Sequence, residues 1–526
     1  MSMWAANSRR ARRAAGYAGG LGLLGLLAGC AVGPDFARPQ APALTHYGAG
    51  SDPSQTVAAL GVAQRFTPGA KVAADWWRLF NSAQLDAVIS EALGSNPGLR
   101  AAQASLHQSE NTLRSGYGIF YPEVDAHAAA TRQRFAPVTL GQNASPSIFN
   151  LFTLSASVSY ALDLFGGERR MIEGLHAQVD VQRATEEATY LTLIANIVNT
   201  VIARAAYQAE IDATNELIGL QREQVRLAEV QVRAGTAPYS SVLALQSQLA
   251  ADEATIPQLE QKLVQSDDLL ATLAGKVPAE WGTPAVRLAD LRLPDDLPVS
   301  LPSELVRQRP DILAAEATAH AASANVGVAT AALLPAITLS GTYSANGTTT
   351  PTLTSAEGRA WQFGAALTQP LFEGGTLWYR RKAAIDSYEQ AMALYRQVVL
   401  AAFAQVADTL RALEHDAAAL QAQDEALRTA REALRLVHIN YEAGLNGYLD
   451  VLVADTLYHE ALINDLQATA VRYQDTVALY VALGGGWWSQ REGGAANPGP
   501  PRSSGAGAGG SPAGGGGDER RTGDHW

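Results

Sequence analysis

The 526-residue sequence contains a single cysteine, Cys30, and only four methionines. One thiol excludes a disulfide or a thiolate metal site within a protomer. Two of the methionines stand at positions 1 and 3, so a methionine-based metal relay has no support. The nine histidines are scattered, and His459-Glu460 lacks the second histidine of a zinc-protease helix. We therefore expect no enzyme active site and no metal site.

Basic residues are also in deficit, since 39 Lys and Arg stand against 51 Asp and Glu, a formal net charge of −12. An acidic chain without a basic stretch argues against nucleic acid as a partner. Long apolar runs are missing as well. No run after Cys30 reaches the about 20 residues of a membrane-spanning helix. A β-barrel hides its lipid-facing side chains in alternation, so this absence is compatible with an outer-membrane protein.

The N-terminus has the parts of a secretory signal. Four arginines between positions 9 and 13 precede the apolar run 14–28, which ends in Leu27-Ala28-Gly29-Cys30. This ending resembles a bacterial lipobox, in which the cysteine is lipidated and becomes the first mature residue. No aspartate follows Cys30, which resembles lipoproteins destined for the outer membrane. Residues 1–29 are thus the expected signal peptide, and the only expected cofactor is a covalent lipid on Cys30.

The sequence contains a long internal repeat, with two copies of the same pattern. Pro97 and Pro122 recur 213 residues later as Pro310 and Pro335. Leu164-Phe165-Gly166-Gly167 recurs as Leu371-Phe372-Glu373-Gly374-Gly375, and Ala234-Gly235 recurs 209 residues later as Ala443-Gly444. A repeat of this length indicates a duplicated architecture rather than a short solenoid unit.

Each copy contains two segments that alternate between apolar and small or polar side chains. These segments are 153–164 and 337–345, with weaker partners at 124–131 and 361–372. Each is close to the roughly 9–11 residues of a transmembrane strand. A half-buried sheet in a soluble domain is the alternative, but two matching pairs favour a membrane barrel. Because the smallest single-chain barrels need about eight strands, and an open edge is not tolerated in lipid, several copies must share one barrel.

Long helices are predicted between these strands and the glycines that follow. The intervals 167–235 and 375–444 contain no proline and could each reach about 100 Å. Shorter helices at 97–122 and 239–275 could flank the long helix end to end. Asn96-Pro97 and Arg309-Pro310 suit helix starts, and Pro257 should interrupt the second short helix.

The pattern divides the chain into six parts. We expect a signal peptide at 1–29, an extended lipid-anchored segment at 30–75, a first repeat at 76–275, a proline-rich linker at 276–302, a second repeat at 303–488, and a disordered Gly/Pro-rich tail at 489–526. The fold class is therefore mixed α and transmembrane β, built from a duplicated helix-strand-strand-helix unit.

Three motifs together resemble the outer-membrane efflux lipoproteins, the TolC-like group of OprM and NodT type. They are Cys30-Ala-Val-Gly-Pro-Asp35-Phe-Ala-Arg-Pro39, Asp75-Trp76-Trp77-Arg-Leu-Phe80 and Ala482-Leu-Gly-Gly-Gly-Trp487. The resemblance implies a homotrimer in the outer membrane of a Gram-negative bacterium. Four strands from each chain would form one twelve-stranded barrel, continuous with a long α-helical periplasmic tunnel. It also implies an exit duct for drugs or other small molecules, joined through a periplasmic adaptor (membrane fusion protein) to an inner-membrane transporter.

The resemblance also assigns residues. The turns at Gly235, Thr236, Gly444 and Leu445 would meet the adaptor at the periplasmic tip. Leu449 matches the leucine that closes the tunnel in this family. The family's aspartate four residues on is absent, because Val453 stands there, and Asp450 and Asp455 are the neighbouring gate candidates. The alternative is a lipid-anchored periplasmic coiled-coil scaffold or adaptor without a pore.

Overall fold

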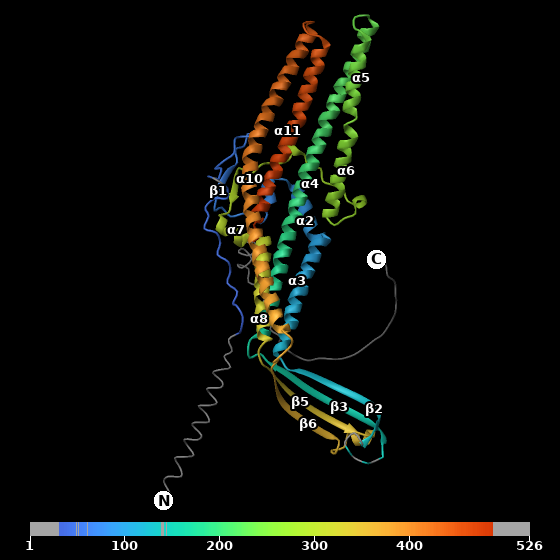
Figure 1. Ribbon diagram of the computed structural model, residues 1–526. Helices are drawn as coiled ribbons and strands as arrows, with labels where there is room; N and C mark the ends of the chain where they lie inside the picture. The colour runs from blue at the N-terminus through green and yellow to red at the C-terminus, as the bar shows by residue number, and fades with distance from the viewer. Residues whose placement is uncertain are drawn as a thin grey trace, which may run out of the picture.

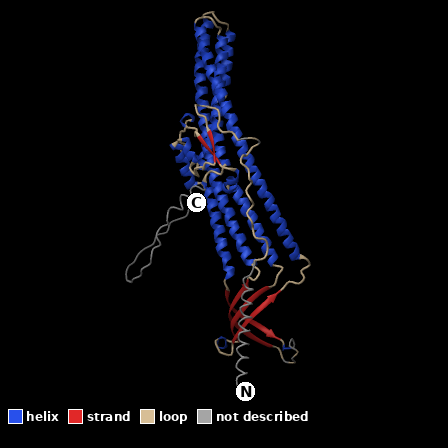
Figure 2. Cartoon of the chain, turned by 90° about the vertical axis from the view of Figure 1, so that its left-hand side faces the viewer, coloured by secondary structure: helices blue, strands red, loops and turns tan. Residues whose placement is uncertain are grey.

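The computed structural model describes residues 31–487, apart from 49, 51, 60, 138–140, 142 and 144. The chain is an elongated rod with a strand sheet at one end and two helical turns at the other (Figures 1 and 2). The signal peptide, the Cys30 anchor and the tail 489–526 expected from the sequence lie outside the described residues.

The two halves have the same order of elements, except that the second adds the short helix α9 and has one helix, α11, where the first has α5 and α6. The first half contains α2 (Ala83–Ser95), α3 (Pro97–Gly116), β2 (Glu123–Phe135), β3 (Ser147–Leu162), α4 (Gly167–Arg233), α5 (Tyr239–Glu253) and α6 (Ile256–Leu273). The second contains α7 (Pro302–Gln308), α8 (Pro310–Ala331), β5 (Ala336–Gly347), α9 (Thr350–Leu353), β6 (Arg359–Thr368), α10 (Thr376–Glu442) and α11 (Tyr448–Ala482). The segment 361–372 is a strand only as far as Thr368, because Pro370 follows.

The long helices α4 and α10 have 67 residues each, as the sequence predicts. Each starts after a glycine with positive φ, Gly166 at 77° and Gly375 at 87°. Contrary to our expectation, α4 contains a stretch that is long and apolar enough to cross a membrane. More than half of that stretch is buried inside the protein, which is typical of a core helix.

The shorter helices stack end to end along the long ones, as expected. In the first half, α3 and α6 both pack on α4, and their ends meet at Asn96. The Asn96 side chain accepts a hydrogen bond from the Leu99 N–H (2.9 Å) and donates one to the Leu273 carbonyl (2.8 Å). Pro257 lies in the first turn of α6, so α5 and α6 are separate, whereas α11 is continuous.

The main core lies midway along the rod, where the short elements meet the long helices. Trp76 stacks on Tyr480 with ring centroids 5.1 Å apart, and both side chains are fully buried. The predicted irregular linker 276–302 is more ordered than expected, since β4 (Asp296–Val299) pairs in parallel with β1 (Arg65–Pro68). The described part of the predicted tether 30–75 packs on the rest of the protein: Tyr47 lies edge-on against Phe403 of α10, and its hydroxyl donates to the Ser300 carbonyl at 2.6 Å.

Candidate functional site

The strand sheet is the first candidate site. Its order is β2-β3-β5-β6, and every neighbouring pair is antiparallel. Leu154 on β3 lies opposite Ala128 and Ala345, whereas Ser155 lies opposite His127 and Ser344. Because side chains alternate between faces, this register places apolar residues beside apolar ones and polar residues beside polar ones.

One face of the sheet is accordingly apolar along the middle of all four strands, and its polar residues Arg132, Arg134, Asn150 and Arg359 lie towards the ends of the strands that are far from the long helices. It carries Val124, Ala126, Ala128 and Ala130, Leu154, Ala156, Val158 and Tyr160, Ile337, Leu339, Gly341 and Tyr343, and Trp361, Phe363, Ala365 and Leu367. Its aromatic side chains face outward, with Phe363 79% exposed. An exposed apolar face that extends over four neighbouring strands is typical of contact with lipid.

The two helical turns are the second candidate site, at the opposite end of the rod (Figure 1). Gly235 and Gly444 both have φ of 73°, the left-handed conformation that glycine adopts at a helix end. The Thr236 N–H donates to the Gln231 carbonyl at 2.9 Å, and the Leu445 N–H donates to the Asn440 carbonyl at 2.8 Å. Both turns therefore have the same closing geometry, and the four predicted tip residues are all exposed.

Leu449 begins an exposed apolar stripe on α11 near these turns. Its side chain is 69% exposed, and Val453 and Leu457 follow at intervals of four residues on the same helix face. The stripe lines a groove of about 1010 Å³ between α10 and α11. Asp450 stands beside it and accepts a hydrogen bond from the Gly447 N–H (3.0 Å), so its carboxylate caps α11.

Asp455 does not share this surface, in contrast to our prediction. Its side chain is 2% exposed, enclosed near Gln224 of α4, Asp252 of α5 and His438 of α10. Burial raises the pKa of its carboxyl to about 6. The physical reason is helix period: Asp455 is two residues after Val453, so at about 100° per residue its side chain points about 160° away from the middle of the stripe.

The structure adds residues that sequence reasoning missed. The Gln231 side chain of α4 donates to the Tyr441 hydroxyl of α10 at 3.0 Å, and Tyr441 packs edge-on against Tyr448. This contact joins the two helical hairpins near the tips. No local signal reveals it, because the partners are 210 residues apart. The stripe through Val453 and Leu457 did have a signal, namely its spacing of four.

Comparisons with known proteins agree with this geometry. The model of the family described as outer membrane efflux protein matches residues 88–276 and 301–485. The pyoverdine export outer membrane protein OpmQ of Pseudomonas aeruginosa is 32% identical over 421 residues, covering 78% of this chain and 87% of the relative. OpmQ of Pseudomonas putida is 30% identical over 414 residues, with coverage of 78% and 87%.

Solved structures share the fold along most of the rod. The outer-membrane channel OprN superimposes with a TM-score of 0.78 at 28% identity, covering 87% of this chain and all (100%) of that one. The MtrE outer membrane channel of Neisseria gonorrhoeae, in its open state, gives a TM-score of 0.74 at 25% identity, with coverage of 87% and 98%.

Proposed function

The chain belongs to the outer membrane efflux protein family, and from that premise we propose how it assembles, opens and is anchored. It is an outer-membrane channel component of an efflux system of a Gram-negative bacterium. The single observation that supports the assembly best is the sheet with one apolar face and two edge strands. Because its relatives are channels, the alternative of a scaffold without a pore is set aside.

The proposed assembly is a homotrimer. The sheet is closed on neither side, because β2 and β6 have no strand partner on their outer edges among the described residues. Unpaired backbone groups are too costly in lipid, so the edges must pair with other copies. Three copies with four strands each form a twelve-stranded barrel, which places the serine-rich face of β3 and β5 around a wet lumen.

The proposed route is passive. Six long helices, two from each copy, extend the lumen by about 100 Å away from the membrane. The tips at Gly235, Thr236, Gly444 and Leu445 meet a periplasmic adaptor, which links the channel to an inner-membrane transporter. Relatives are named for cargoes as different as pyoverdine, toluene and cations, so we assign cargo choice to the transporter.

The proposed gate is apolar. Leu449 and its symmetry mates converge near the tips and exclude water, as hydrophobic constrictions do. Val453 and Leu457 support an apolar rather than a charged ring. Asp450 holds the start of α11 in place, and buried Asp455 is left out of the gate. A covalent lipid on Cys30 completes the proposed arrangement as a second attachment to the membrane.

The test of the assembly is an arginine scan of β3. Leu154→Arg or Val158→Arg puts a charge on the apolar face and costs about 2–4 kcal/mol near the bilayer midplane. Ser155→Arg and Ser157→Arg are the matched controls, because they change the opposite face of the same strand. Trimers in the outer-membrane fraction should be lost in the first pair and kept in the second. Equal tolerance of all four substitutions would contradict a membrane-spanning sheet.

A further inference from the structure

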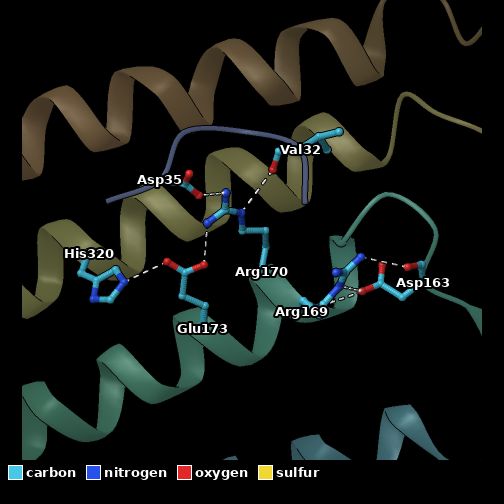
Figure 3. Close-up of polar contacts among 7 residues, drawn as sticks. All are labelled: Val32, Asp35, Asp163, Arg169, Arg170, Glu173 and His320. Carbon is cyan, nitrogen blue, oxygen red and sulfur yellow. Dashed lines mark hydrogen bonds and ion pairs between the residues drawn. The ribbon is translucent and has the colours of Figure 1, made fainter. Parts of the chain in front are cut away.

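Residues 31–38 lie against the start of α4 and the middle of α8, in a site centred on Arg170 (Figure 3). The Arg170 guanidinium is almost enclosed, with 6% of its side chain exposed. It donates to the Val32 carbonyl at 3.2 Å and to the Asp35 carboxylate at 2.5 Å. Its third contact is Glu173 at 2.7 Å, so one buried cation joins the N-terminal segment to α4.

The segment is held at further points on both sides of Arg170. The Val32 N–H donates to the carbonyl of Phe165, in the connection between β3 and α4, at 2.9 Å. Phe36 stacks on His320 of α8 with ring centroids 4.6 Å apart, and His320 contacts Glu173 at 2.9 Å (Figure 3). Hydrogen bonds, an ion pair and a stacked ring therefore fix the path of the segment.

Three glycines from distant parts of the chain make room for this segment. A Cβ at Gly33 would overlap the backbone of Gly327, and a Cβ at Gly166 would overlap Ala31. A Cβ at Gly327 would meet the Arg170 side chain and the Val32 carbonyl. Gly33 and Gly166 also have positive φ, at 94° and 77°. The site is thus shaped for close backbone contact.

The site, built from α4 of the first repeat and α8 of the second, has no counterpart at the repeat-related positions. Counted from Gly166 and Gly375, the residue that corresponds to Arg170 is Tyr379, and the residue that corresponds to Glu173 is Lys382. The shift of 213 residues that relates α3 to α8 places Arg114 where α8 has Gly327. The repeat-related positions, Tyr379 and Lys382 on α10 and Arg114 on α3, therefore lack the cation of Arg170, the carboxylate of Glu173 and the clearance at Gly327. The two halves of the duplicated fold therefore differ at the site that the N-terminal segment contacts.

We propose that residues 31–38 are a docking segment and that the Arg170 site fixes the lipid anchor beside the junction of β3 and α4. The part concerning the lipid rests on the proposed lipidation of Cys30. Val32 stands two residues after Cys30, and two residues span at most about 7 Å. Acyl chains on Cys30 therefore start next to the barrel wall, and the anchor is a fixed attachment rather than a flexible tether.

The experiment is a thiol cross-link within one protomer. A lipidated Cys30 has no free thiol, so Phe36→Cys with His320→Cys supplies the only reactive pair in the mature chain. A short bismaleimide should join the two cysteines in trimers isolated from outer membranes. Adding Arg170→Ala should slow the reaction about tenfold or more, because charge-assisted hydrogen bonds to the segment are lost. Arg169→Ala is the matched control, since this neighbour binds Asp163 (Figure 3) and should leave the rate unchanged.

A second variant guards against misfolding of Arg170→Ala. Asp35 is 94% exposed, so Asp35→Ala cannot disturb the core, and it should also slow the cross-link. Equal cross-linking rates in the unmodified, Arg170→Ala and Asp35→Ala backgrounds would overturn the proposal. Labelling of the same preparations with fatty acid separates the premise from the inference. If the unmodified background incorporates the fatty acid but cross-links slowly, docking of residues 31–38 is overturned. If it cross-links fast but incorporates no fatty acid, only the lipid anchor at Cys30 is overturned.

Discussion

Single leucines in exposed positions carry the proposed gate. Leu449→Ser replaces the tip of the apolar stripe with a side chain that water wets, so it should raise the single-channel conductance severalfold in planar bilayers without breaking the trimer. Leu243→Ser is the control, because Leu243 is also an exposed leucine but lies on α5 of the other hairpin. Unchanged conductance in an intact Leu449→Ser trimer would rule out this residue as the gate.

The buried carboxyl of Asp455 makes stability depend on pH. Its pKa is about 6 in the folded protein, against 3.8 for an ordinary aspartate, so the folded state binds the proton more tightly. The contribution of this carboxyl to stability is therefore greatest below about pH 4 and is lost as pH rises through about 6. Asp455→Asn should raise the free energy of unfolding by about 2 kcal/mol at neutral pH and have little effect in acid. Thermal unfolding followed by circular dichroism at both pH values checks this. A variant less stable than the parent at neutral pH would contradict it.

At the scale of elements, the sequence predicts the strands and helix ends that depend on neighbouring residues alone. The alternation in 153–164 and the glycines at 235 and 444 predict β3 and both helix ends, because side-chain periodicity and left-handed glycine are local properties. Leu449 and the tip residues are assigned through the family resemblance instead, and their exposure follows from their places beside the turns.

Contacts between distant segments have no such local signal. The pairing of β1 with β4, and the docking of 31–38 on α8, depend on partners more than two hundred residues away. Proline and glycine content therefore suggested a loose linker and a loose tether where the protein is ordered. The burial of Asp455 was missed for a related reason: its neighbours come from three other helices.

Asn96 joins the ends of two helices, which gives an element-scale prediction. Asn96→Ala removes the cap of α3 and the donor to the last turn of α6, so it should cost about 1–2 kcal/mol of stability. Asn96→Asp keeps the acceptor for the Leu99 N–H but loses the donor to Leu273. It should therefore fall between the parent and Asn96→Ala in thermal unfolding at neutral pH. No loss in either variant would show that the junction is held by packing alone.

At the scale of the whole molecule, the repeat specifies how neighbouring copies should pair. Within one protomer, Ser155 of β3 lies opposite Ser344 of β5. The repeat places Gln362 of β6 where β3 has Ser155, and Thr131 of β2 where β5 has Ser344. If the trimer interface copies the internal one, Gln362→Cys and Thr131→Cys should form a disulfide between copies.

Gels without reductant check this pairing, since the double variant should migrate as a covalent trimer. Gln362→Cys with Ala130→Cys is the control, because Ala130 lies on the opposite face of β2. Efficient covalent trimers from the control pair alone would mean that the interface has a different register from the one within the protomer.

The interruption between α5 and α6 makes the two hairpins mechanically unequal. In the hairpin of α10 and α11, both helices run without a break between the tip and the core, whereas the α4/α5 hairpin has one continuous helix beside a jointed one. Under the same lateral force at the tips, the α10/α11 hairpin should therefore bend less than the α4/α5 hairpin. In the proposed trimer, three stiffer and three more flexible hairpins alternate around the axis, so widening of the tunnel end should follow threefold rather than sixfold symmetry.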